Sequence, residues 1–271
     1  MNGQRNAVPR VFWIAAAMLV LFFSYPVIGL LGGVGWGRLQ EAWGDPLVKQ
    51  AVWVSLKTST AATLLMGVLG IPVGYLLARS NFPGRAVVTA LMYLPLMLPP
   101  LVGGILLLAV YGPYSAVGQW LAHWNISLTG SLPAIVAAQM FVAAPYVVIT
   151  ARASFLAVDP EMELIAETLG DSRWQAFRRI AVPLAWRGLT AGLALAWVRS
   201  LGEFGATLVV AYTPHTLPIW LWAVLTSAGL QAALPLALLL LLLGMAALAA
   251  VALLGELRAG VPHAGAFGGK P

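Results

Sequence analysis

The chain has 271 residues, of which 61% are hydrophobic and only 9% are charged. A soluble domain usually carries about 25% charged residues, so this composition excludes an ordinary soluble fold and indicates a protein surrounded by lipid. The net charge of +6 therefore indicates membrane topology rather than a nucleic-acid partner. Cysteine is absent, which excludes disulfides, thiolate metal sites and a cysteine nucleophile.

Six apolar blocks follow one another along the chain, and each is long enough for a helix to cross the hydrocarbon core. They comprise residues 11–31, 51–78, 86–110, 132–151, 188–212 and 232–255. Their apolar residues run continuously instead of alternating, which favours helices over the strands of a barrel. The sequence thus predicts an all-α integral membrane protein with about six transmembrane helices.

The first block follows Arg5 and Arg10, an arrangement that also begins a secretory signal peptide. A signal peptide has a shorter apolar core, and no small-residue cleavage site stands out after this block. We therefore expect residues 11–31 to remain in the protein as its first transmembrane helix.

The distribution of Lys and Arg predicts the orientation of these helices, because cytoplasmic loops carry an excess of both. With the N-terminus inside, only Arg38 and Lys49 fall in outer loops. We therefore expect both termini in the cytoplasm. The basic residues on that side would be Arg5, Arg10, Arg79, Arg85, Arg152, Arg173, Arg178, Arg179, Arg187, Arg258 and Lys270.

Residues 152–187 form the one long polar segment, so we expect them to meet water or a partner. Asp159 can cap the start of a helix. Within that helix, Met162, Ile165 and Leu169 recur at helical spacing and form one apolar stripe. The pattern predicts a short amphipathic helix.

A second short helix follows in the same segment. Gly170 fits the end of the first helix, and Ser172 with Gln175 three residues later forms a capping box that starts the next. We expect Pro183 to end this second helix. Its apolar face would comprise Trp174, Phe177 and Ile180.

Two short amphipathic helices at the inner face of a membrane admit two interpretations. They can be a connector that lies on lipid, or a plug that fills a groove in a soluble partner. The residue pattern by itself leaves both open.

Residues 163–183 read ELIAETLGDSRWQAFRRIAVP. They resemble the Glu-Ala-Ala loop of type I ATP-binding-cassette import permeases, which has that triplet, three residues, Gly, nine residues and then Ile-x-Leu-Pro. Gly170, Ile180 and Pro183 match this pattern in residue and in spacing.

The segment departs from the family pattern at two places. Val182 stands where the pattern has Leu. The triplet is replaced by Leu164-Ile165-Ala166, and a glutamate lies one position earlier, at Glu163.

In the family that this segment resembles, the loop docks in a cytoplasmic ATPase. The resemblance implies three protein partners: cytoplasmic ATP-binding-cassette ATPase subunits, an extracytoplasmic substrate-binding protein and a second copy of this chain. It also implies a multi-pass location in a bacterial or archaeal plasma (inner) membrane. The residues it assigns to the ATPase-coupling loop are Glu163, Ala166, Gly170, Trp174, Phe177, Ile180 and Pro183.

The resemblance covers roughly residues 51–255, which we expect to form the permease domain. Residues 1–50 would add the first transmembrane helix and an outer loop. Residues 256–271 are rich in glycine and end in proline, so we expect them to form a disordered tail.

Two further segments resemble the molybdate and tungstate permeases within that family. Residues 94–100 read LPLMLPP and residues 201–207 read LGEFGAT. Sulfate permeases tend to have Pro-Thr in place of Pro99-Pro100. Residues 211–215 read AYTPH where a Gly-Asn-x-Pro-Gly run is expected, so sulfate or another small solute remains the alternative cargo.

The same two segments contain the candidate residues for a transport pathway. Pro95, Pro99 and Pro100 cannot all lie in one regular helix, and a break in a membrane helix is tolerated where it packs on protein or lines a cavity. A charged pair four residues apart, Arg199 and Glu203, usually faces a bundle interior or an aqueous cavity. A static kink and a purely structural ion pair are the alternatives. The pathway or gate candidates are Pro99, Pro100, Arg199, Glu203, Phe204 and Thr207.

Several signatures of other protein classes are absent from the sequence. There is no Gly-x-x-x-x-Gly-Lys-Ser/Thr loop to bind ATP and no hydrolase motif, and the three histidines have no metal-ligand spacing. We therefore expect a transport subunit without enzymatic activity, metal or cofactor of its own, with ATP hydrolysis on a separate subunit. An ATP-independent secondary transporter or channel is the remaining alternative, although no internal repeat supports it.

Overall fold

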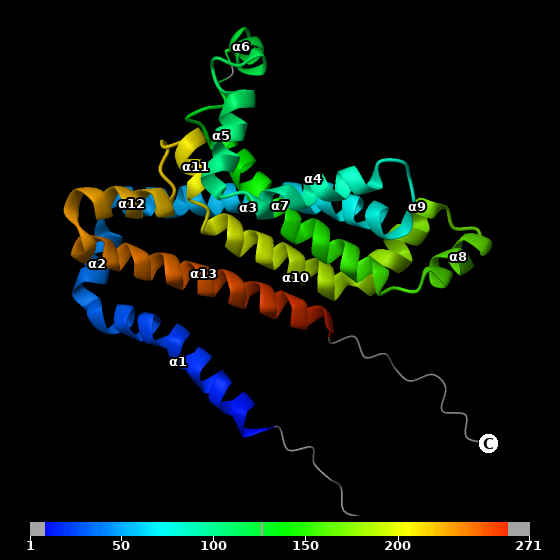
Figure 1. Cartoon of the computed structure of the whole chain (residues 1–271), viewed down its shortest axis with the longest axis horizontal. Helices are drawn as coiled ribbons and strands as arrows, with labels where there is room; N and C mark the ends of the chain where they lie inside the picture. The colour runs from blue at the N-terminus through cyan, green and yellow to red at the C-terminus, as the bar shows by residue number, and fades with distance from the viewer. Residues whose placement is uncertain (1–8, 126, 260–271) are drawn as a thin grey trace, which may run out of the picture.

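The computed structural model describes residues 9–125 and 127–259 of the chain. All regular structure in these residues is helical (Figure 1). The elements are α1 (Arg10–Gly33), α2 (Trp36–Gly44), α3 (Pro46–Arg79), α4 (Arg85–Met97), α5 (Pro100–Tyr111), α6 (Ala116–Ala122), α7 (Leu132–Leu156), α8 (Pro160–Thr168), α9 (Arg173–Ala176), the π-helical turn η1 (Phe177–Ala181), α10 (Val182–Leu201), α11 (Gly205–Val210), α12 (Leu217–Ala228) and α13 (Leu230–Ala259).

Five helical segments in this part of the chain are long and apolar enough to cross a membrane. They are α1, α3, α7, the segment Arg173–Leu201 and α13. The bent pair of α4 and α5 makes a sixth if the pair counts as one span. The all-α fold and the number of about six spans are therefore confirmed.

The fifth span differs from its predicted bounds of 188–212. The helix already begins at Arg173 and ends at Leu201, and a separate short helix, α11, follows. Gly202 favours an end at this point because glycine is a poor helix former. The Glu203 carboxylate then accepts a hydrogen bond from the backbone N–H of Ala206 at 2.8 Å, in the first turn of the new helix.

The core of the molecule is the packing of α3, α7 and α10 side by side (Figure 1). Small residues allow their backbones to approach closely, as is common between membrane helices. At Gly74 in α3, an added Cβ atom would lie 2.6 Å from the Cβ atom of Ala151 in α7. At Gly192 in α10, it would lie 1.8 Å from the Oγ1 atom of Thr150 in α7.

Helices α12 and α13 cover one end of α3. Val48 and Val52 of α3 pack with Leu217 of α12 and Leu236 of α13 in one buried cluster. The Ser55 hydroxyl of α3 also accepts a hydrogen bond from the Leu217 backbone N–H at 2.8 Å, at the start of α12. This contact satisfies a backbone donor that a helix N-terminus leaves free.

Two parts of the chain lie outside this bundle. Helix α1 is apolar and has no buried residue, and Figure 1 shows it apart from α3, α7 and α10. Helices α5 and α6 form an arm that projects from the bundle (Figure 1). An apolar helix with no protein face is suited to lipid or to another chain.

The predicted C-terminal tail, residues 256–271, is described only at its start. Helix α13 continues to Ala259, so the first four residues of that segment are helical. Residues 260–271 lie outside the described residues, as does Arg5 at the other end of the chain.

We expect Gly74→Val to destabilise the protein by about 1–3 kcal/mol, the range typical of overpacking a close contact. The added side chain would meet Ala151 and the backbone N–H of Arg152, which lies 3.0 Å from the Cβ position. Thermal unfolding of the purified protein in detergent measures the effect. Gly244→Val in α13 is the matched control, because no atom lies within 4 Å of the Cβ position there. Equal melting temperatures of the two variants would contradict the proposed close packing.

Candidate functional site

Helix α8 begins and ends as its sequence predicts. The Asp159 carboxylate accepts a hydrogen bond from the Glu161 backbone N–H at 2.9 Å and caps the first turn. At the other end, Gly170 has φ = +102°, a conformation that glycine adopts readily. The backbone N–H of Asp171 then donates to the Ala166 carbonyl at 3.0 Å, which closes a Schellman motif. These local signals fix the length of α8.

The second helix also starts as predicted, at a capping box. The Ser172 hydroxyl accepts from the Gln175 backbone N–H at 3.3 Å, and the Gln175 side chain accepts from the Ser172 backbone N–H at 2.6 Å. The prediction that Pro183 ends this helix is wrong. Proline lies in the first turn of α10, directly after the π-helical turn Phe177–Ala181. A π-turn shifts the hydrogen-bond pattern, so the helix continues past a residue that lacks an N–H.

Helix α8 has one face toward the bundle and one toward its surroundings. Glu163 and Ala166 are buried, whereas Met162, Leu164 and Ile165 are exposed. The exposed large apolar residues between the start of α8 and the end of α9 are Met162, Leu164, Ile165, Leu169 and Trp174. We refer to these five residues as the apolar loop face.

The remaining predicted loop residues surround α9 and η1. The rings of Trp174 and Phe177 stack with their centroids 5.3 Å apart. Phe177 and Ile180 are half-buried, and Pro183 is exposed. Phe177 also meets the Tyr75 ring of α3 at 4.6 Å, so this predicted apolar face packs partly on the bundle instead of facing outward as a whole.

The buried side of α8 forms a polar cluster with the end of α3. The Tyr75 hydroxyl donates to Glu163 Oε2 at 2.5 Å. The Arg79 guanidinium donates from Nε to Glu163 Oε1 at 2.8 Å and from Nη2 to the Val158 carbonyl at 2.8 Å. The Glu163 side chain is 8% exposed and that of Arg79 15%. A buried charge held by two hydrogen-bond donors in this way is well compensated.

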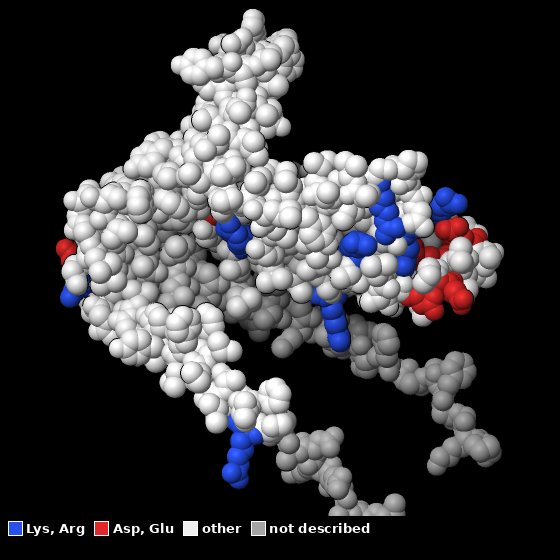
Figure 2. Space-filling view, viewed as in Figure 1, with Lys and Arg blue, Asp and Glu red and all other residues white. Residues whose placement is uncertain are grey.

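Sequence reasoning placed Glu163 in the loop but missed its partners Tyr75 and Arg79. They lie more than 80 residues earlier in the chain, and their spacing of four residues on α3 was the one local signal. Charged groups are otherwise sparse on the bundle. Figure 2 shows acidic and basic side chains gathered at the end of the molecule formed by α8 and α9.

The second group of predicted residues lies at a break in the third span. Helices α4 and α5 meet at an angle of 120°. Pro99 precedes α5 and Pro100 is its first residue, which is the helical position that tolerates a missing N–H. The predicted break at these prolines is therefore confirmed, and it is much sharper than a kink within one span of residues 86–110.

This break packs against the second break in the chain, between α10 and α11. An added Cβ atom at Gly205 would lie 3.0 Å from the backbone N of Leu101 and 3.1 Å from the Cβ atom of Pro100. At Gly104 it would lie 2.7 Å from the Ala206 carbonyl oxygen. The two segments 94–100 and 201–207, which the sequence singled out separately, thus meet in the structure.

Arg199 and Glu203 form an ion pair at this junction, with Nη1 and Oε2 2.7 Å apart. Glu203 is 1% exposed, and the side chain of Arg199 is 26% exposed. Arg199 lies in the last turn of α10, whereas Glu203 lies in the break itself. The pair therefore fastens the end of one helix to the start of the next, α11.

The two other predicted pathway residues also lie at this junction. Thr207 in α11 is fully buried, and its hydroxyl has no hydrogen-bond partner among the described residues. The Phe204 ring lies 5.6 Å from that of Trp222 in α12. Gln139 of α7, which the sequence did not indicate, donates to the Ser200 carbonyl at 3.1 Å and is likewise buried. The junction is thus a polar cluster inside an apolar bundle.

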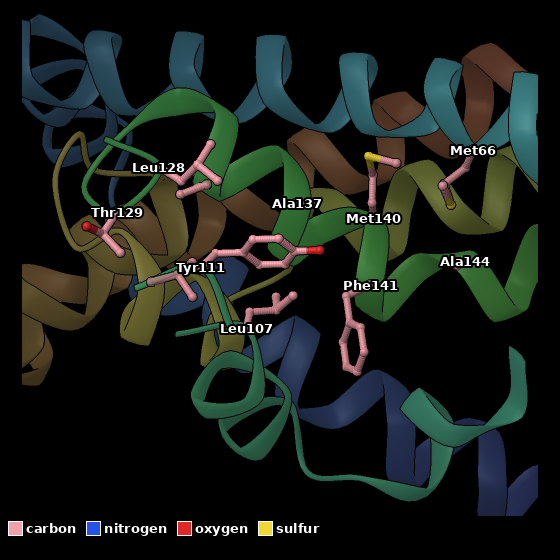
Figure 3. Close-up of a pocket in the computed structure, with 11 residues that line it drawn as sticks. Met66, Leu107, Tyr111, Leu128, Thr129, Ala137, Met140, Phe141 and Ala144 are labelled. Carbon is pink, nitrogen blue, oxygen red and sulfur yellow. The ribbon is translucent and has the colours of Figure 1, made fainter. Parts of the chain in front are cut away.

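A separate pocket of about 440 Å³ lies between α5, α7 and α11. Figure 3 shows the Tyr111 ring reaching across it toward Met140, with Thr129 at the opposite end. Its other lining residues are apolar, among them Leu107 and Phe141. The described residues that line it do not include any predicted pathway residue, and an apolar lining is unsuited to an oxyanion.

Comparison with known proteins agrees with the fold. A family model described as "Binding-protein-dependent transport system inner membrane component" matches residues 70–257. A bacterial ABC transporter involved in the import of the acidic polysaccharide alginate has a similar structure, with a TM-score of 0.73 and 16% sequence identity. The match covers 91% of this chain and 96% of the other.

Three relatives are named as permease proteins of transporters or transport systems. A probable molybdenum ABC transporter permease protein of Haloferax volcanii is 40% identical over 89% of this chain and 88% of its own length. A molybdate/tungstate transport system permease protein of Thermococcus kodakarensis is 39% identical over 89% of this chain and 94% of its own. A sulfate transport system permease protein of Escherichia coli is 38% identical over a shorter stretch, 67% of this chain and 65% of its own.

The protein is therefore an ABC transporter permease, a transport subunit that crosses the plasma membrane several times. The chain belongs to the family of binding-protein-dependent transport system inner membrane components.

We expect Glu203→Gln to lower the free energy of unfolding by about 3 kcal/mol, because removal of one partner leaves the other charge poorly compensated. The glutamine oxygen can still accept from Ala206, so the helix cap is retained. Arg199→Met with Glu203→Gln should cost less than the sum of the two single changes, by about 1 kcal/mol or more. Denaturation of the four proteins in detergent measures this cycle, and strictly additive effects would show that the ion pair does not couple α10 to α11.

Proposed function

We propose that the chain is the permease subunit of an importer for molybdate or tungstate, driven by ATP hydrolysis on a separate subunit. The proposal that ATP hydrolysis on a separate subunit drives transport rests on the apolar loop face. Five exposed apolar side chains project from α8, from the residue that follows it and from the first turn of the next helix, at the charged end of the bundle. That is the surface expected of an element that fills a groove in a soluble protein, and it favours the docking interpretation over a connector that lies on lipid.

The proposed arrangement has α8 and α9 in the cytoplasm, together with both termini. The excess of Lys and Arg on that side supports it. Cytoplasmic ATP-binding-cassette subunits would bind the apolar loop face, and a substrate-binding protein would deliver cargo at the opposite side of the membrane. A second copy of the chain would complete the pathway, as in the family that the loop resembles.

The cargo assignment rests on relatives and on the junction of the two breaks. Permeases named for molybdenum, and for molybdate and tungstate, match most of the chain at about 40% identity. The two segments that resemble those permeases pack against each other. The sulfate permease matches at a similar identity over a shorter stretch, so sulfate is the alternative cargo.

The junction is suited to passage of an anion rather than to its tight retention. Arg199 is cationic and partly exposed, but Glu203 neutralises much of its charge at 2.7 Å. A pathway residue must release its cargo as well as attract it. In the proposed cycle, ATP closes two ATPase subunits, the loops transmit this movement, and the breaks at Pro99–Pro100 and at 202–204 change between outward and inward openings.

We expect Gly170→Pro to abolish binding of the ATPase subunit while the membrane spans remain folded. Proline cannot adopt the φ of +102° found at Gly170, so the connection between α8 and α9 must change. Co-purification of the ATPase with the tagged permease measures the loss, and an unchanged melting temperature of the permease is the control for folding. Full co-purification of the ATPase with this variant would refute the docking role of the loop.

We expect deletion of the gene to lower cellular molybdenum or tungsten at trace supply, and complementation to restore it. Elemental analysis of cells grown on both oxyanions identifies the cargo. In a strain without a second uptake system, unchanged content of both metals would refute this cargo. Uptake that persists after loss of the ATPase would instead favour an ATP-independent transporter.

A further inference from the structure

Glu163 links the proposed coupling loop to a membrane-spanning helix. Its side chain is buried and points away from the apolar loop face, into the cluster with Tyr75 and Arg79. We propose that Glu163 is a positioning residue that fastens α8 to α3, so that movement of α8 reaches α3 through this side chain instead of through a contact of Glu163 with the ATPase. The proposal rests on the function proposed above.

The burial of Glu163 argues against a direct contact with a partner. Both of its carboxylate oxygens already accept hydrogen bonds, one from the Tyr75 hydroxyl and one from the Arg79 guanidinium. Its neighbours Leu164 and Ile165 are each 58% exposed and face outward. A docked protein would therefore touch the residues beside Glu163, whereas the carboxylate would remain on the bundle side of α8.

The polar contacts between α8 and α3 depend on the Glu163 side chain. Helix α8 packs mainly on α9 and η1. Among the described residues, the hydrogen bonds and the ion pair that join α8 to α3 are all made by Glu163. Arg79 additionally donates to the Val158 carbonyl in the connection between α7 and α8, so the same guanidinium holds both the start of the loop and its first helix.

Helix α3 is suited to carry a displacement across the membrane. It is continuous over 34 residues, which corresponds to about 50 Å at 1.5 Å per residue. Near its far end, Ser55 accepts from the backbone of Leu217, so α12 is attached to the same helix. A displacement of α8 would thus reach α12, whose Trp222 ring lies 5.6 Å from Phe204 at the break after α10.

The first test compares Glu163→Gln with the wild-type permease in the reconstituted complex with its ATPase and molybdate-loaded binding protein. We expect the ATPase to co-purify at the wild-type level, because the apolar loop face is intact. We expect stimulation of ATP hydrolysis by the binding protein to fall at least fivefold.

Glu161→Gln is the matched control, an exposed glutamate in the same helix, and should change stimulation less than twofold. Tyr75→Phe removes one hydrogen bond but keeps the ring, and should give a loss of about twofold.

The second test replaces the polar link by a covalent one. The chain contains no cysteine, so Arg79→Cys with Glu163→Cys provides the only two thiols on the permease for a short bismaleimide. Without the cross-linker, we expect the double variant to be as poorly stimulated as Glu163→Gln. With the cross-linker, stimulation should return to at least half of the wild-type value. The ATPase should co-purify equally with and without the cross-linker, which would separate a lost link from a loop that has lost its fold.

Four outcomes would overturn the proposal. These are wild-type stimulation in Glu163→Gln, loss of ATPase co-purification in that variant, an equal loss in Glu161→Gln, and a cross-linked protein that stays unstimulated. The second would make Glu163 a contact for the ATPase. If the wild-type permease failed to bind the ATPase at all, the proposed function itself would fail. If Glu163→Gln fails to fold, the comparison with and without cross-linker decides.

Discussion

The absence of water in the hydrocarbon core is the constraint on which this structure depends. Each backbone N–H and C=O group there needs a partner within the protein, so all regular structure in the described residues is helical. Interruptions occur where other groups compensate them. The break at Pro99 packs against Gly205 and Ala206, and the break after α10 is capped by Glu203. Two irregular segments that would each be unfavourable in lipid are thus tolerated because they lie together, inside the protein.

Features that depend on a few adjacent residues could be predicted from the sequence. The caps of α8 and α9, the end of α8 at Gly170 and the break at Pro99 each require only local geometry. The bounds of the fifth span could not be predicted, because the apolar pattern does not reveal a helix that begins in the polar loop and passes Pro183 through a π-turn. The contact between the two breaks could not be predicted either, because the sequence does not give the distance in space between segments that lie far apart in the chain.

The two polar clusters illustrate different uses of a buried carboxylate. Glu203 pairs with Arg199 one turn away, so its partner could be read from the spacing of four residues. Glu163 pairs with Arg79, 84 residues earlier, and nothing in the loop sequence indicates this partner. The first pair joins two consecutive helices, whereas the second joins two helices that lie far apart in the chain, α3 and α8. The longer link is the one that can relate events at the loop to the membrane-spanning bundle.

The apolar loop face has a consequence for the life of the protein in the cell. All five of its residues expose large apolar side chains, and Met162, Leu164, Ile165 and Leu169 lie outside the candidate membrane spans, whereas Trp174 lies at the start of one. Exposed patches of this kind attract chaperones and promote aggregation, and cells degrade chains that present them. A permease synthesised in excess of its ATPase should therefore be short-lived, so that the supply of one subunit limits the abundance of the other without any dedicated regulator.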